Sequence, residues 1–115
     1  MSSPLCHFEL MTKDPDKAKA FYGQVFGWQF DDQTMPGYTL ISTGQDPHGG
    51  IMKQPESPAA SNIYFKVADI EATLAKVKEL GGKVTVPKSE IPGIGFFALF
   101  VDPEGIGIGL MQPAE

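Results

Sequence analysis

Two stretches of the sequence, HFELMTKD at residues 7–14 and NIYFKVAD at residues 62–69, share the pattern that decides the fold. Each alternates its side chains as a β-strand does, and each ends at an aspartate suited to capping a helix. The shift between the two stretches is 55 residues. A repeat of this length in a chain of 115 residues predicts two copies of one structural unit.

A helix pattern follows each of these strands. Pro15 stands at the first helical position of the first copy, and apolar residues recur at helical spacing in both copies. We therefore expect helices near 15–26 and 70–81, ended by Gly27 and Gly82.

Three strand patterns complete each copy. The expected strands are WQF (28–30), YTLIST (38–43) and GGIMKQP (49–55) in the first copy, and KVTV (83–86), FFALFV (96–101) and GIGLMQP (107–113) in the second. The segments DPHG (46–49) and DPEG (102–105) suit type I turns before the last strand of each copy. At the closing Gln-Pro the shift has grown to 58, so we place three extra residues near SEIPGIG (89–95).

The sequence thus predicts an α+β fold in one domain over residues 1–115, built from two β-α-β-β-β modules at about 5–55 and 61–113. We interpret 55–62 as a connector, because about 50 residues cannot easily form a core alone. The strands are expected to form one or two curved mixed sheets, with helices outside and the concave face open as a pocket. Whether the modules pair within a chain or swap across a dimer stays open.

The first strand presents an ionisable face to this expected pocket. His7 and Glu9 point to one side, opposite Phe8 and Leu10. Histidine beside a carboxylate is typical of acid–base chemistry, and a carboxylate nearby is expected to raise the pKa of His7. The alternative is that the two side chains only satisfy one another beside a water-filled groove.

Other polar side chains are predicted to reach the same pocket. We expect the second copy to supply part of the pocket floor and two residues of the first copy to lie at its edge: Asn62, Tyr64 and Lys66 on the floor, and Tyr38 and Lys53 at the edge. A tyrosine or lysine there would bind the ligand or steady a developing oxyanion.

Composition excludes several classes of function. The net charge of −5 argues against the basic face that nucleic-acid binding needs, and it suits a cationic small molecule. One cysteine permits no disulfide within the chain, and no apolar run is long enough to span a membrane, so we expect a cytoplasmic protein. GIGIG (105–109) enters a strand rather than a helix and does not indicate a dinucleotide site. Exposed sheet edges predict a homodimer.

Four segments resemble the vicinal oxygen chelate superfamily, also called the glyoxalase, bleomycin-resistance and dioxygenase superfamily: AKAFYGQVFGW (18–28), HGGIM (48–52), ELGG (79–82) and FVDPEG (100–105). The resemblance runs from His7 to Gln112, and it is greatest to small glyoxalase-like proteins. It implies a small-molecule ligand held in the concave pocket.

The resemblance also implies where a divalent metal would bind: at His7, Ile51, Asn62 and Gly109. Only His7 is a strong metal ligand, whereas a catalytic site normally uses three protein ligands. We therefore expect neither a catalytic metal nor another cofactor. Three ways to a metal stay open: Glu9 as a second ligand, a ligand from a partner chain, or a site elsewhere.

The resemblance leaves three functions open. The first is a metal-independent lyase, isomerase or epimerase that uses His7 and Glu9 on a small oxygenated substrate. The second is a binding protein that sequesters a ligand, as bleomycin-resistance relatives do. The third is a binding or regulatory module for a metabolite.

Overall fold

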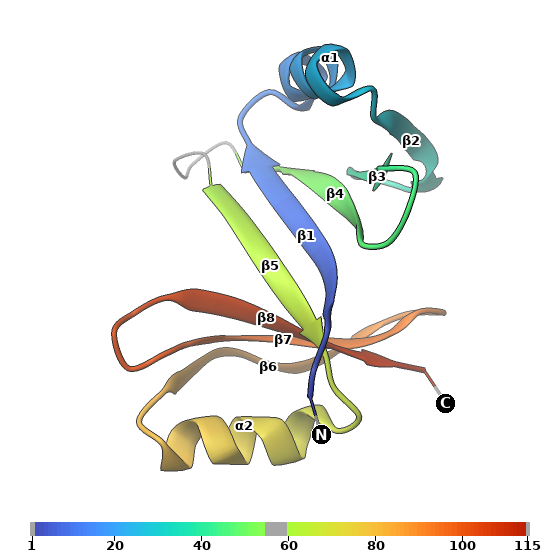
Figure 1. Cartoon of the computed structure of the whole chain (residues 1–115). Coiled ribbons are helices and arrows are strands. Elements are labelled where there is room, and N and C mark those ends of the chain that lie inside the picture. The colour runs from blue at the N-terminus through green and yellow to red at the C-terminus, as the bar shows by residue number, and fades with distance from the viewer. Residues whose placement is uncertain (1, 55–59, 115) are drawn as a thin grey trace. The chain divides into compact units, whose positions relative to one another are not determined.

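The computed structural model describes residues 2–54 and 60–114, and the chain divides into two compact units. One unit is His7–Asn62, and the other joins Met1–Cys6 to Ile63–Glu115. The elements follow the order that the repeat predicts, β-α-β-β-β twice (Figure 1).

The unit His7–Asn62, called the first unit below, contains a mixed sheet of four strands in the order β2-β3-β4-β1. β1 runs parallel to β4, and the other neighbours are antiparallel. Its elements are β1 (Leu5–Thr12), α1 (Pro15–Phe26), β2 (Gln29–Met35), β3 (Tyr38–Ser42) and β4 (His48–Lys53).

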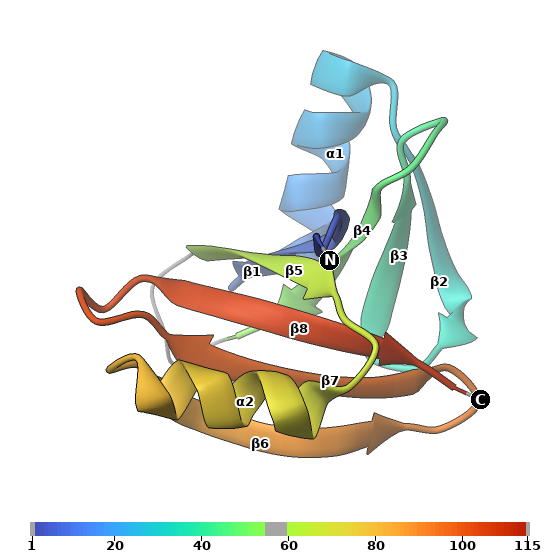
Figure 2. The same ribbon diagram turned by 60° about the horizontal axis from the view of Figure 1, so that its bottom comes forward.

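The second unit has the corresponding order, β5-β8-β7-β6, with β5 parallel to β8. Its elements are β5 (Ala60–Lys66), α2 (Ile70–Glu79), β6 (Lys83–Ile91), β7 (Gly95–Val101) and β8 (Gly107–Pro113). α2 lies along the sheet of β6, β7 and β8 (Figure 2). The backbone N–H of Lys66 donates to the Pro4 carbonyl over 2.9 Å, so the N-terminal residues join this unit. The predicted α+β class with mixed sheets is confirmed.

The aspartates that close HFELMTKD and NIYFKVAD cap the helices as predicted. Asp14 accepts the Lys17 N–H over 3.1 Å, and Asp69 accepts the Ala72 N–H over the same distance. These bonds satisfy amide groups that have no partner within the first helical turn. A single aspartate in each copy therefore fixes where strand ends and helix begins.

The two helices end differently. Gly27 ends α1 in the left-handed conformation, with φ of 71°, as predicted. α2 ends at Glu79, and the left-handed residue is Gly81, with φ of 98°, so the prediction of Gly82 was wrong by one position. Gly82 instead donates its N–H to the Val77 carbonyl over 2.8 Å, which closes the last turn.

The two turn predictions have different outcomes. At DPEG the Gly105 N–H donates to the Asp102 carbonyl over 2.9 Å, as a type I turn requires. DPHG does not form that turn, because His48 and Gly49 already belong to β4.

The extra residues of the second copy lie where the sequence placed them. β2 begins at Gln29 and β3 at Tyr38, whereas β6 begins at Lys83 and β7 at Gly95. The second hairpin therefore holds three more residues than the first, which confirms the insertion around SEIPGIG.

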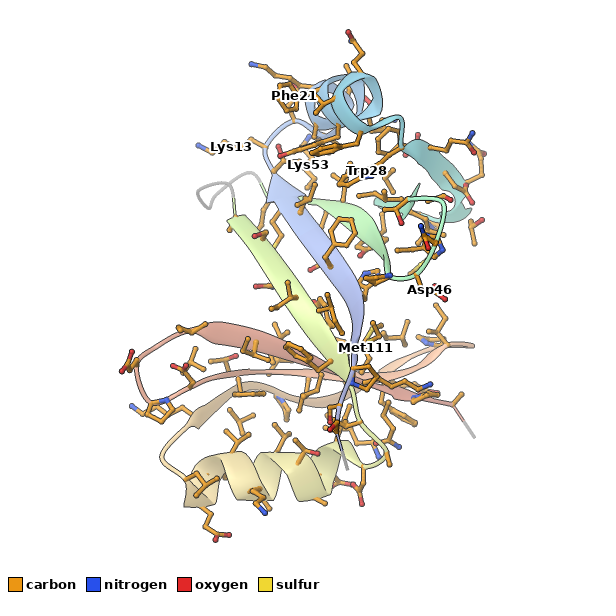
Figure 3. The ribbon with its side chains drawn as sticks, viewed as in Figure 1. Lys13, Phe21, Trp28, Asp46, Lys53 and Met111 are labelled. Atoms are coloured by element: carbon orange, nitrogen blue, oxygen red, sulfur yellow. The ribbon has the colours of Figure 1, made fainter. Side chains whose placement is uncertain are left out.

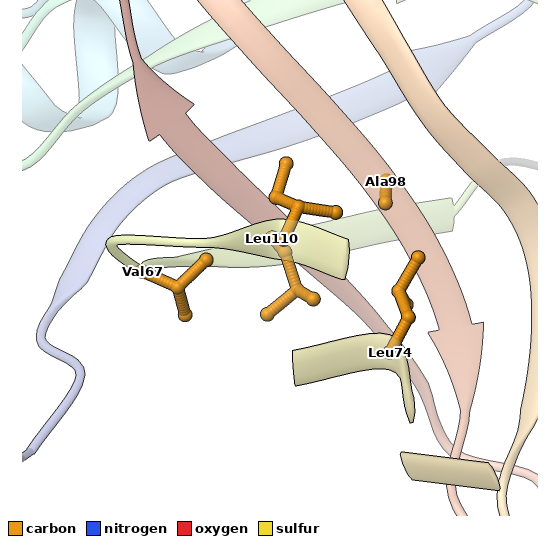
Figure 4. Packing of buried hydrophobic residues seen from close by; sticks show 5 residues of the cluster. Val67, Leu74, Ala98 and Leu110 are labelled. Carbon is orange, nitrogen blue, oxygen red and sulfur yellow. The ribbon is translucent and has the colours of Figure 1, made fainter. Parts of the chain in front are cut away.

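Buried apolar side chains hold each unit together. In the second unit the core comprises Val67, Ile70, Leu74, Ala98 and Leu110 (Figure 4). The Ile70 N–H donates to the Gln112 side-chain oxygen over 2.8 Å, which ties the start of α2 to β8. In the first unit Ile41 and Ile51 are buried, and Trp28 packs against Phe8 and Tyr22 with ring centroids 5.4 and 5.5 Å apart.

Candidate functional site

The register between β1 and β4 decides which side chains share a face of the first unit. Glu9 pairs with Gly50, and Leu10 pairs with Ile51. Because paired residues on neighbouring strands project to the same side, His7, Glu9 and Gly50 share one face and Ile51 lies on the other.

A tyrosine from β3 reaches the histidine of β1 on this face. The Nε2 atom of His7 and the hydroxyl of Tyr38 lie 2.9 Å apart, within hydrogen-bond distance. The two rings are stacked, with centroids 6.5 Å apart and an angle of 21° between planes. Residues 31 positions apart in sequence thus form the central polar contact of the site.

Gly50 makes room for that contact. A Cβ atom built at Gly50 would overlap the hydroxyl and ring atoms of Tyr38. A glycine inside a strand often marks such a close approach. Gly50 was missed as a site residue from the sequence, although two consecutive glycines in HGGIM were a signal that could have identified it.

Burial sets the protonation of His7. The pKa of His7 lies below its ordinary value because desolvation penalises the charged imidazolium. The expectation that the pKa of His7 is raised was therefore wrong, because burial is the dominant influence. His7 is a neutral imidazole near pH 7, which is the form that can accept a proton.

Asn62 extends the same face. Its side-chain nitrogen lies 3.8 Å from the Met11 sulfur, within the range of a weak N–H···S hydrogen bond. Met11 follows Glu9 by two residues and so projects to the same side of β1. The first unit therefore gathers His7, Glu9, Tyr38 and Asn62 on one face, which we call the His7 face.

The second unit has its own tyrosine over a glycine. Tyr64 is 5% exposed, and a Cβ atom at its register partner Gly109 would overlap the Tyr64 ring. Lys66 is exposed and stands in register with Met111 on β8. Burial raises the pKa of the Cys6 thiol, and the Lys66 charge opposes this rise. That Tyr64 and Lys66 share a pocket with His7 stays a prediction.

Two residues of β4 do not belong to the His7 face. Ile51 is 1% exposed on the opposite side, and Lys53 follows it by two residues on that same side. Lys53 ends β4 opposite Thr12, close to where β1 leads into α1 (Figure 3). By register Gly50 takes the place expected for Ile51, whereas a role for Lys53 at the pocket edge stays a prediction.

These residues do not fit a divalent metal. Gly50 and Gly109 have no donor, and tyrosine rings fill the space that a side chain at either position would need. Within residues 2–54 and 60–114, no group of three or more histidine, cysteine, aspartate or glutamate side chains is arranged to hold an ion. A catalytic metal normally requires three protein ligands.

Among the described residues, no helix is long and apolar enough to cross a membrane.

Comparison with known proteins agrees with this architecture. A putative glyoxylase from Mycobacterium bovis is 36% identical over 112 residues, which is 92% of this chain and 42% of that protein. A probable lactoylglutathione lyase from Vibrio cholerae is 31% identical, over 94% of this chain and 89% of that protein. The chain thus spans less than half of the mycobacterial relative.

A solved structure shares the fold at lower identity. The methylmalonyl-CoA epimerase from Mycobacterium tuberculosis superposes with a TM-score of 0.74 at 16% identity, over 96% of this chain and 88% of that one. The family profile of the Glyoxalase/Bleomycin resistance protein/Dioxygenase superfamily matches residues 5–110. The chain therefore belongs to this superfamily, as the resemblance of its segments 18–28, 48–52, 79–82 and 100–105 predicts.

Proposed function

We propose that this chain binds a small oxygenated metabolite at the His7 face and transforms it by metal-independent acid–base chemistry, as a lyase or isomerase. The observation that carries the proposal is the contact of 2.9 Å between His7 and Tyr38. A half-buried histidine bonded to a tyrosine, beside a carboxylate, is typical of proton-transfer sites.

Each residue has a role in this proposal. His7 accepts or returns a proton, because its lowered pKa keeps the imidazole neutral near pH 7. Glu9 stabilises the imidazolium that forms when His7 takes up a proton. Asn62 donates from its amide to an oxygen of the ligand, and we assign Tyr64 and Lys66 of the second unit to ligand binding.

Relatives support the reaction class. The Vibrio cholerae relative is a probable lactoylglutathione lyase, and the structurally similar Mycobacterium tuberculosis protein is an epimerase. Both names describe rearrangement or cleavage next to a carbonyl group, which requires that a proton be removed and returned. A histidine with access to a proton relay suits such a step.

An assay of S-lactoylglutathione formation from methylglyoxal and glutathione tests the proposal. Protein treated with EDTA and dialysed should retain its rate, whereas His7→Ala and Glu9→Gln should each lower kcat by about 10²-fold or more. Glu79→Gln is the matched control, since Glu79 is exposed at the end of α2. A rate that depends on added metal would contradict the proposal, and so would full activity in His7→Ala.

A second candidate function is sequestration of a cationic ligand without turnover. The net charge of −5 and the carboxylate of Glu9 on the His7 face favour it. Calorimetric titration with bleomycin would then show binding that Glu9→Gln weakens and salt screens, with the ligand recovered unchanged. Binding unaffected by Glu9→Gln would remove this candidate.

A further inference from the structure

The ring and the hydroxyl of Tyr38 each make a contact that bears on its role. Its ring occupies the space above Gly50, and its hydroxyl lies 2.9 Å from His7 Nε2. The phenol is therefore confined in position as well as bonded.

The chemistry of the two groups gives the direction of this hydrogen bond. A neutral imidazole has one N–H donor and one bare nitrogen acceptor. A phenol is a stronger donor than an alcohol, and the bare nitrogen of imidazole is a stronger acceptor than a phenol oxygen. The favoured arrangement therefore has the Tyr38 O–H donating to Nε2, with the imidazole proton on Nδ1.

We infer that Tyr38 fixes His7 in the tautomer protonated on Nδ1 and is the group through which His7 exchanges protons with a ligand. In that tautomer Nε2 is the nitrogen that accepts a proton, and Tyr38 occupies it. The proton exchange through Tyr38 rests on the proposed function, whereas the tautomer of His7 does not.

The proposed relay moves two protons and conserves the total charge. A proton passes from the ligand to the Tyr38 oxygen while the phenol's own proton passes to Nε2. The ligand becomes an anion, Tyr38 remains neutral, and His7 becomes an imidazolium. The reverse transfer to another atom of the ligand completes an isomerisation.

Other titratable groups of the first unit face His7 on this side of the sheet. Glu9 lies two residues along β1, and His48 is the register partner of His7 on β4. The His48 ring accepts the Thr43 N–H and lies 3.5 Å from Asp46. A negative charge on Glu9 favours the imidazolium, so it opposes the effects of burial and of the Tyr38 hydrogen bond.

Long-range ¹H–¹⁵N NMR spectra of the whole chain test the inference without any substrate. The chain has two histidines, so His48→Asn assigns the His7 signals. We expect a bare Nε2 and a protonated Nδ1 in the unsubstituted protein. Removing the donor in Tyr38→Phe should raise the pKa of His7, because the hydrogen bond favours the neutral form.

Two controls separate this role from general perturbation. Tyr22→Phe removes the same hydroxyl from a ring stacked on Trp28 and should leave the pKa of His7 unchanged. Gly50→Ala should reproduce the effect of Tyr38→Phe by displacing the ring, whereas Gly107→Ala, with open space around its Cβ, should not. Thermal melts establish that each variant is folded, and Tyr38→Phe alone decides the matter if Gly50→Ala does not fold.

The outcomes distinguish the inference from the proposed function. A protonated Nε2 in the unsubstituted protein, or a pKa of His7 that stays or falls in Tyr38→Phe, overturns the inference. Where turnover is found, Tyr38→Phe should lower kcat about as much as His7→Ala while leaving KM nearly unchanged, and a full kcat would overturn the relay. Absence of turnover with every substrate would contradict the proposed enzymatic function. The NMR spectra would still decide which tautomer His7 adopts.

Discussion

The ring of Tyr64 lies over Gly109, its register partner on β8, in the space that a side chain at residue 109 would have to enter. In the first unit the ring of Tyr38 lies over Gly50, although Tyr38 comes from the antiparallel neighbour β3 and pairs with Met52 rather than Gly50. In each copy of the repeat, a glycine of the last strand thus receives a tyrosine ring. A side chain larger than hydrogen at either glycine would therefore displace a tyrosine ring.

Gly109→Ala should destabilise the protein by about 1–3 kcal/mol, because the added methyl group overlaps a buried ring and the core must shift. Urea unfolding measures the effect. Gly107→Ala is the matched control, since its Cβ would contact nothing within 4 Å. Equal stability of the two variants would contradict the account of the Tyr64 packing.

Stability should fall in acid through His7. Burial lowers the pKa of His7 in the folded chain, so as the pH falls the unfolded chain takes up the proton first. The contribution is fully present above the ordinary histidine pKa of about 6.5 and is lost as the pH falls through the lower pKa of the folded chain. Urea unfolding from pH 7.5 to pH 5 should show a smaller loss in His7→Gln than in the unsubstituted protein. An equal loss in both would mean that His7 is not the group responsible.

Gln112→Leu should cost about 1–3 kcal/mol, because it leaves the buried N–H of Ile70 without its acceptor at the start of α2. Gln112→Glu keeps an acceptor oxygen for the Ile70 N–H. Its free energy of unfolding at neutral pH should therefore be closer to that of the unsubstituted protein. The exposed Gln29→Leu should change stability little. Denaturant unfolding compares the three.

Divalent metals should not raise the melting temperature. Donors are missing at Gly50 and Gly109, and one histidine is too weak a site alone. Melts with Ni²⁺, Zn²⁺ or Mn²⁺ should match melts in EDTA. Stoichiometric metal that disappears in His7→Ala would contradict this.

A homodimer is expected in solution. In the sheet of the first unit β2 is a terminal strand, and its free edge can be covered by another chain. Sedimentation equilibrium should report twice the chain mass of 12.4 kDa. A monomer at high micromolar concentration would exclude this assembly.

The repeat made the elements predictable, because strand alternation, aspartate caps and glycine stops are local signals. Pro15–Phe26 was predicted at both ends, and the insertion in the β6–β7 hairpin was found by comparing the two copies. The site was harder to predict. An error of one residue in the predicted register of β4 moves each of its side chains to the opposite face of the sheet. The sequence therefore placed Ile51 at the position that Gly50 occupies.

Contacts between distant residues explain the remaining differences. His7 and Tyr38 lie 31 positions apart, and no local pattern couples them. The pKa of His7 depends on burial, which requires the packed fold, so the sequence suggested the nearby carboxylate of Glu9 as the dominant influence instead.

Residues 2–6 belong with the second unit, where the Pro4 carbonyl accepts the Lys66 N–H, although they lie at the other end of the sequence and run into β1. The repeating unit of the sequence therefore does not coincide with the unit that folds together. A fragment beginning at residue 60 would lack this partner, whereas a circular permutant that joins the chain's ends through a linker and opens near residue 55 would keep it. Shuffling half-chains among relatives should accordingly succeed only when the N-terminal residues travel with the C-terminal half.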